Sequence, residues 1–124
     1  MKHFYYIHHI MGNEFSVAVG TTKNFAIIKL NGSMSAKNII EIRKIFEETL
    51  KKNSSIVVDL SGVTLLDSMG VGILVNFYRI VSAKRGQFAA VCPPSDPRDI
   101  LEVADLHRLF QIFDTMEEAE VKVC

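Results

Sequence analysis

The strongest constraint on the fold is a nearly continuous apolar run in the middle of the chain, Ile56-Val57-Val58-Asp59-Leu60. A strand with one face in water alternates apolar and polar residues, and this run does not. It is typical of a strand that is buried on both faces. Such strands belong to parallel sheets, whose strands are joined by crossover connections, usually helices.

The segments on either side of this run have the spacing of amphipathic helices. Before the run, apolar side chains recur every three or four residues, at Ile39, Ile42, Ile45, Phe46 and Leu50. Ser35 is expected to cap that helix, and Lys51-Lys52-Asn53 to close it. After the run, the pattern repeats from Ser68 to Lys84, and Gly86 ends it.

The remaining elements are shorter. Strands are predicted at residues 15–19, 25–30, 88–92 and 112–113, with 63–66 continuing the central strand and Asn31-Gly32 ending the second. A helix begins at Asp96 or Asp99, and Thr115 with Glu118 forms a capping box for a last helix.

This order, β-β-α-β-α-β-α-β-α, predicts a single α/β domain over residues 15–124. The sheet is expected to be mixed and mostly parallel, with the first two strands antiparallel. Residues 1–14 are expected to be a separate N-terminal segment, either an extra strand or an arm.

Charge and length narrow the classes of partner. Lys plus Arg and Asp plus Glu both number 14 among 124 residues, so the net charge is zero. Nucleic acid and anionic membranes are therefore not expected as partners, because both require a basic surface. No apolar run approaches the length of about 20 residues that spans a bilayer. Weak self-repulsion leaves a homodimer open as an alternative.

The cysteines and the N-terminus predict a cytoplasmic protein. Cys92 and Cys124 lie far apart in unlike contexts and are interpreted as free thiols of a reducing compartment. Residues 1–11 lack a basic region followed by a clean apolar stretch, so they make a poor signal peptide.

The segment from Ser61 to Gly72 is the first candidate for a functional site, because partners of open α/β sheets meet the carboxyl ends of the strands. Ser68 stands where the helix begins, and there the dipole and the unpaired N–H groups would tolerate a phosphate. Such a phosphate adds about −1.5 to −2 charges. Gly70 and Gly72 leave room for the backbone of another protein.

The same residues also have a purely structural interpretation. Ser and Asp are ordinary N-cap residues, so Asp67 or Ser68 would then serve only to begin the helix. Gly70 and Gly72 would serve the close packing of the helix on the sheet. The residues alone leave both interpretations open.

Catalysis, metal binding and cofactor binding find little support, so the chain is not expected to be an enzyme. A hydrolase nucleophile elbow needs Gly-x-Ser-x-Gly, and Leu66 occupies the place of the first glycine. His107 has no evident link to Ser68. His3, His8 and His9 lack a completing group of ligands for a metal. Neither a P-loop nor a dinucleotide-binding pattern is present.

Two motifs in the centre of the chain carry a family resemblance. They are Val57-Val58-Asp59-Leu60-Ser61-Gly62-Val63 and Leu66-Asp67-Ser68-Met69-Gly70-Val71-Gly72. Together they resemble the signature of STAS domains, the anti-sigma factor antagonist family, and the likeness extends over about residues 15–120. The chain differs from the family pattern at Met69, where Ser or Thr is frequent, and at Ser35, where Asp is frequent.

The resemblance implies a regulatory binding module with no chemistry of its own. It implies that an anti-sigma factor serine kinase phosphorylates Ser68 and is thereby released, and that a PP2C-type phosphatase restores binding. The residues expected to contact the partner are Asp67, Ser68, Met69, Gly70, Val71, Gly72 and Ser35.

Two other functions remain open. One is a scaffold or self-associating STAS module that does not switch, with an apolar contact formed by Met69, Val71 and Ile73. The other is a sensor domain that holds a small ligand or nucleotide near the same loop.

Overall fold

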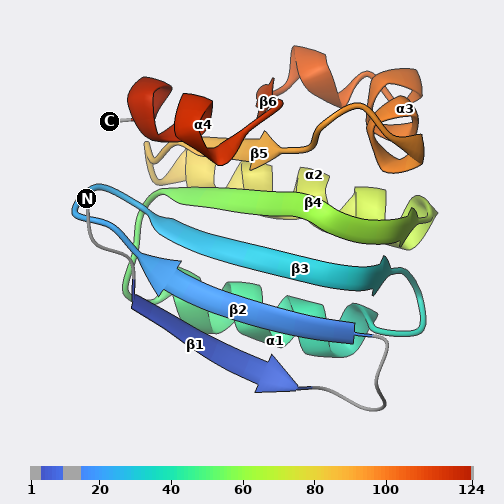
Figure 1. Cartoon of the computed structure of the whole chain (residues 1–124). Helices are drawn as coiled ribbons and strands as arrows, with labels where there is room; N and C mark the ends of the chain where they lie inside the picture. Colours follow the sequence, from blue (N-terminus) through green and yellow to red (C-terminus); the bar gives the residue numbers. More distant parts are fainter. Residues whose placement is uncertain (1–3, 10–14, 124) are drawn as a thin grey trace.

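The computed structural model describes residues 4–9, for which only the backbone path is considered, and residues 15–123 (Figure 1). Six strands are found in this part of the chain: β1 (Phe4–His9), β2 (Phe15–Thr21), β3 (Ala26–Met34), β4 (Ile56–Leu66), β5 (Phe88–Val91) and β6 (Gln111–Phe113). The helices are α1 (Ile39–Leu50), α2 (Ser68–Ala83), α3 (Asp96–Val103) and α4 (Met116–Lys122), with a 3-10 turn at Leu106–Arg108. His3 and Cys124 lie outside the described residues.

The strands form one mixed sheet in the order β1-β2-β3-β4-β5-β6. The first two pairings are antiparallel and the other three are parallel. The predicted fold class, a mixed and mostly parallel α/β sheet, is confirmed. The structure adds β1 at the edge, whereas the division of the chain at residue 14 stays a prediction.

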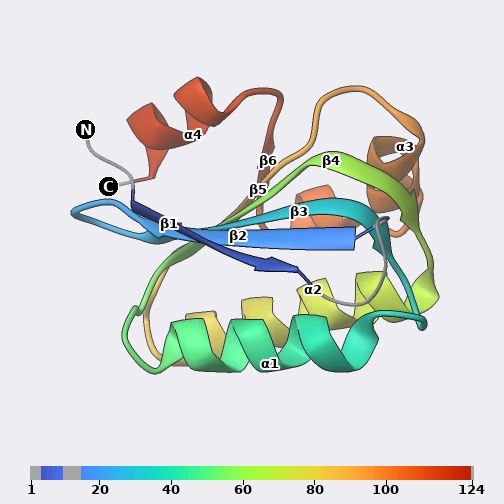
Figure 2. The same ribbon diagram turned by 60° about the horizontal axis from the view of Figure 1, so that its bottom comes forward.

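The helices cover both faces of the sheet, as Figure 2 shows: α1 and α2 lie beneath it and α4 lies above it. The larger core fills the α1 and α2 face and contains Ile56 and Val58, whereas Val57 packs into a second core under α4. All three side chains are at most 1% exposed. The central run therefore forms a strand buried on both faces, as its composition predicts.

Two details of the β3–α1 connection differ from the sequence predictions. The strand does not end at Asn31-Gly32: Gly32 adopts a φ of 96°, the pairing with β4 shifts register there, and β3 continues to Met34. Ser35 does not cap α1, because the helix begins at Ile39 with Asn38 as the N-cap residue. A turn closed by the bond from the Asn38 N–H to the Ser35 carbonyl separates the two elements.

Candidate functional site

The connection between β4 and α2 consists of a single residue, Asp67, which is the N-cap of α2. Its Oδ1 atom accepts hydrogen bonds from the backbone N–H groups of Met69 at 3.0 Å and Gly70 at 3.1 Å. The Asp67 carbonyl accepts the N–H of Val71 at 3.0 Å. The Asp67 carboxylate thus satisfies two of the N–H groups that a helix leaves unpaired at its first turn, and its carbonyl accepts the first bond of the helix itself.

The second carboxylate oxygen of Asp67 reaches a different part of the chain. Oδ2 accepts the backbone N–H of Ala36 at 3.1 Å, in the turn that precedes α1. Burial would raise the pKa of Asp67, but the hydrogen bonds from the Gly70, Ala36 and Met69 amides together lower it below its ordinary value. Asp67 is therefore ionised at neutral pH and joins the beginnings of two helices.

Ser68 is the first residue of α2 and is exposed to solvent. Two of the amides that were expected to hold a phosphate on its hydroxyl, those of Met69 and Gly70, are already occupied by the Asp67 carboxylate. A phosphate on Ser68 would therefore stand beside the Asp67 carboxylate without these donors. The added charge would remain exposed at the surface, because the N-terminus of the helix would do little to stabilise it.

The two glycines of the motif have different surroundings. A Cβ atom on Gly70 would lie 2.4 Å from the Met34 carbonyl oxygen and 2.7 Å from Leu66 Cδ1, so this glycine is needed for close packing of α2 on β3 and β4. A Cβ atom on Gly72 would meet nothing within 4 Å. The structural interpretation therefore accounts for Gly70, and the surface at Gly72 is open.

The apolar side chains of the first turns of α2 also differ in their exposure to solvent. Met69 is 45% exposed, whereas Ile73 is only 2% exposed and belongs to the core. Val71 is half-buried. The prediction that Ile73 takes part in an apolar contact with a partner is therefore wrong.

Ser35 lies near Asp67, but its side chain is not exposed to solvent. It is 6% exposed, and its hydroxyl oxygen accepts a hydrogen bond from the Ser33 hydroxyl at 2.8 Å. Ala36, the next residue, donates to Asp67. Ser35 thus shapes the turn that Asp67 holds.

An apolar groove of about 480 Å³ borders Ser68, between the first turns of α2 and the length of α3. We call it the α2–α3 groove. Leu66, Ser68 and Val71 line one wall, and Ile100, Val103 and Ala104 line the other. Asp67 and Asp99 supply the two carboxylates among its lining residues.

The α3 wall of this groove was missed by sequence reasoning. Pro97 and Leu101 occupy the buried face of α3. Val103 is 87% exposed and Ile100 is 37% exposed. Four apolar residues compete for one face of this eight-residue helix, so the sequence spacing alone does not decide between them.

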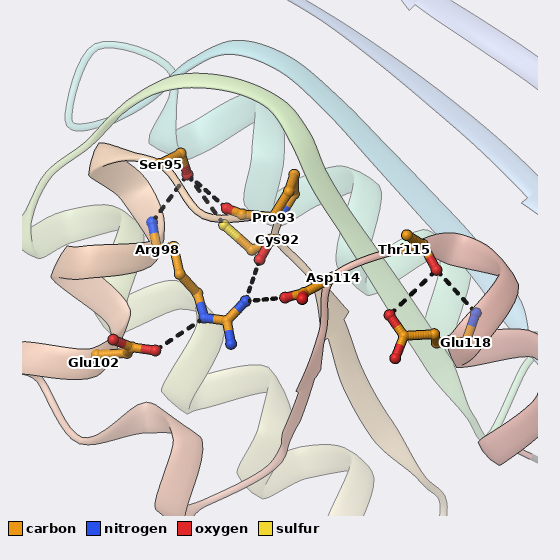
Figure 3. Close-up of polar contacts among 8 residues, drawn as sticks. All are labelled: Cys92, Pro93, Ser95, Arg98, Glu102, Asp114, Thr115 and Glu118. Carbon is orange, nitrogen blue, oxygen red and sulfur yellow. Dashed lines mark hydrogen bonds and ion pairs between the residues drawn. The ribbon is translucent and has the colours of Figure 1, made fainter.

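Figure 3 shows what holds α3 in place at the ends of β5 and β6. The Arg98 guanidinium donates to the Cys92 carbonyl at 2.6 Å, to Asp114 at 2.8 Å and to Glu102 at 3.2 Å. The Ser95 hydroxyl accepts the Arg98 N–H at 3.3 Å and caps the helix. These contacts fix the outer wall of the groove.

Among the described residues, no three His, Cys, Asp or Glu side chains come together as a metal site. Within those residues, no helix combines the length and apolar character that crossing a bilayer requires. His107 lies in the 3-10 turn after α3 and is not among the residues that line the groove. Cys92 is a free, buried thiol.

Comparisons with known proteins agree with this fold. Residues 16–119 match the STAS domain family. A Thermotoga maritima protein, provisionally named an anti-sigma factor antagonist, is 32% identical over 99 residues, which are 78% of this chain and 88% of that protein. The crystal structure of a Thermotoga maritima protein that is likewise provisionally named an anti-sigma factor antagonist superposes with a TM-score of 0.71 at 31% identity, over 78% of this chain and 86% of that one.

Two more distant structures share the fold alone. An anti-sigma factor antagonist from Mycobacterium paratuberculosis gives a TM-score of 0.81 at 20% identity, over 88% of this chain and 93% of that chain. SpoIIAA of Bacillus, in its phosphorylated form, gives a TM-score of 0.64 at 18% identity, over 96% of this chain and 98% of that chain.

The chain belongs to the STAS domain family. Within that family it is an anti-sigma factor antagonist-like protein with bacterial relatives. STAS anti-sigma factor antagonists are generally regulatory proteins without enzymatic activity.

Proposed function

We propose that this protein is an anti-sigma factor antagonist whose binding to an anti-sigma factor serine kinase is switched by phosphorylation of Ser68. The observation that carries the proposal is the position of Ser68 at the first turn of α2. Its side chain is exposed, and its backbone is fixed by the adjacent Asp67 cap. A kinase can thus reach this hydroxyl without unfolding the helix.

The surface around Ser68 supports a protein contact. Met69 and the open face at Gly72 lie on the same exposed first turns of α2, and Val71 lines the groove beside them. The phosphorylated form of SpoIIAA is a precedent for modification within this fold. In this proposal Asp67, Ser68, Met69, Val71 and Gly72 contact the partner.

Gly70 and Ser35 have a different place in the proposed contact. Both are buried, so they shape the surface without presenting side chains to the kinase.

Phosphorylation would act through charge. The phosphate adds about −1.5 to −2 charges next to the Asp67 carboxylate, whose amide partners are already used. Contact with an apolar or acidic partner surface would then require that charge to be desolvated, which is costly. The partner is released, and a PP2C-type phosphatase restores the binding form.

The test is intact-mass analysis of the protein after incubation with ATP and an anti-sigma factor kinase encoded in the same genome. We expect the mass of one phosphate to appear on the wild-type protein and on Ser54→Ala, a control at another exposed serine. Ser68→Ala should remain unmodified. Equal modification of Ser68→Ala and wild type would overturn the proposal.

A further inference from the structure

The α2–α3 groove has the size of a small-ligand site. Its volume of about 480 Å³ falls within the range of roughly 300–1,000 Å³ that such sites occupy. Most of its lining side chains are apolar, namely Leu66, Val71, Ile100, Val103 and Ala104. A molecule in this groove would cover the exposed apolar surface of α3 and lie beside the Ser68 hydroxyl.

The charged groups of the groove have one sign. Its lining residues include the carboxylates of Asp67 and Asp99 and no Lys, Arg or His side chain. Asp67 is already engaged by three backbone N–H groups. No ion pair between described residues includes Asp99, so its charge is available to a ligand.

The cationic side chain of α3 does not neutralise the Asp99 carboxylate. Arg98 precedes Asp99, but its guanidinium is committed to Glu102, Asp114 and the Cys92 carbonyl (Figure 3). The same contacts hold α3 against the ends of β5 and β6. The groove is thus a preformed apolar surface with an unbalanced carboxylate at its edge.

We propose that the α2–α3 groove binds a small amphiphilic amine, with its apolar body against Val71, Ile100 and Val103 and its ammonium group at Asp99. An amine is favoured because its positive charge is opposite to that of the carboxylates in the groove. A carboxylate or nucleotide phosphate would be repelled by the same residues. The inference goes beyond the proposed function, since the site exists without phosphorylation.

The experiment compares three probes with one apolar body: 4-phenylbutylamine, 4-phenyl-1-butanol and 4-phenylbutyrate. Each is titrated into the full-length protein, and the backbone amide shifts are followed by NMR. The amine should give saturable shifts at Val71, Ile100 and Val103, with a dissociation constant on the order of 0.1–1 mM for so small a probe. The alcohol should bind more weakly, and the carboxylate most weakly.

Matched variants locate the ammonium group. Asp99→Asn should weaken binding of the amine by about two- to fivefold and leave binding of the alcohol unchanged, as for an exposed ion pair. Asp96→Asn removes the same charge from the same helix outside the groove, and it should change neither. Ser68→Asp should strengthen amine binding, which is the opposite of its proposed effect on the kinase.

Three outcomes would overturn the inference. They are the absence of saturable shifts in the groove, binding of the carboxylate as tight as that of the amine, and equal effects of Asp99→Asn and Asp96→Asn. A monomer–dimer equilibrium that Val103→Glu abolishes would show instead that a second copy of the chain fills the groove. Since no kinase is used, these failures are distinct from a failure of the phosphorylation proposal.

Discussion

The carboxylate of Asp67 accepts a hydrogen bond from the backbone N–H of Ala36, with 3.1 Å between Oδ2 and N, across 31 residues of sequence. The other oxygen of the same carboxylate caps α2. A single side chain therefore fixes both the helix that presents Ser68 and the turn that leads into α1. The consequences of this double role can be measured.

Replacement of Asp67 should lower the stability of the fold and should also reduce the dependence of that stability on pH. Asp67→Ala should lower the free energy of unfolding by about 1–2 kcal/mol at neutral pH, because an N-cap and a link between turns are lost. The pKa of Asp67 is lowered in the folded state, so this stabilisation is present above the ordinary value of 3.8 and disappears as the pH falls through the lowered pKa. Urea unfolding of both proteins between pH 7 and about pH 3 measures the difference.

Asp67→Asn is the matched control for this titration. Its amide oxygen can still accept the capping hydrogen bonds, but the side chain no longer titrates. The variant should therefore lack the part of the pH dependence that belongs to Asp67. A difference between wild type and Asp67→Ala that stays constant into acid would contradict the assignment.

The two glycines of the motif should respond oppositely to the same substitution. Gly70→Ala places a Cβ atom 2.4 Å from the Met34 carbonyl oxygen and should destabilise the protein by about 1–3 kcal/mol. Gly72→Ala meets open space in a helix and should stabilise it by about 0.5–1 kcal/mol. Thermal unfolding of both variants is sufficient, and a similar loss in both would show that the packing of α2 is misassigned.

The Arg98–Asp114 pair should contribute measurably to the attachment of α3. The Asp114 carboxylate raises the pKa of the Arg98 guanidinium, and Arg98 also donates to the Cys92 carbonyl. Arg98→Met should cost about 1–2 kcal/mol. A double-mutant cycle with Asp114→Asn should give a coupling of about 0.5–1 kcal/mol, discounted because Asp114 is more than half exposed.

Arg108→Met is the control for that cycle. Its ion pair with Asp105 is 3.9 Å long and both side chains are largely exposed, so its loss should stay within about 0.5 kcal/mol. If the two arginines contributed equally, Arg98 would have no special role in holding α3.

The end of α2 offers a stabilising substitution. Arg85 has a φ of 63°, in the left-handed region that favours glycine. Arg85→Gly should raise the free energy of unfolding by about 0.5–1 kcal/mol. Lys84→Gly, at a φ of −91°, should be neutral or destabilising, and a gain at both positions would refute the conformational explanation.

The fold was largely predictable because its signals are local. The run from Ile56 to Leu60 identified a doubly buried strand, and capping chemistry placed a helix after Asp67. The burial of Ser35 and the exposure of Val103 were not predictable from spacing. They depend on contacts between distant segments, such as the bond from Ala36 to Asp67 and the attachment of Arg98 to Asp114.

The candidate site was predicted in part for the same reason. The β4–α2 junction follows from sequence, and Asp67 proved to be the cap. Whether each glycine serves packing or access required the positions of Met34 and Leu66, which come from other parts of the sheet.

The most direct test of the central claim is the affinity of an anti-sigma factor kinase for Ser68→Ala and Ser68→Asp, measured by isothermal titration calorimetry. Both variants should unfold at temperatures close to that of the wild type, because Ser68 is exposed at the first turn of α2. The account predicts that Ser68→Ala binds the kinase and that Ser68→Asp binds it at least tenfold more weakly, about 1.4 kcal/mol. Equal binding by the two variants would contradict it.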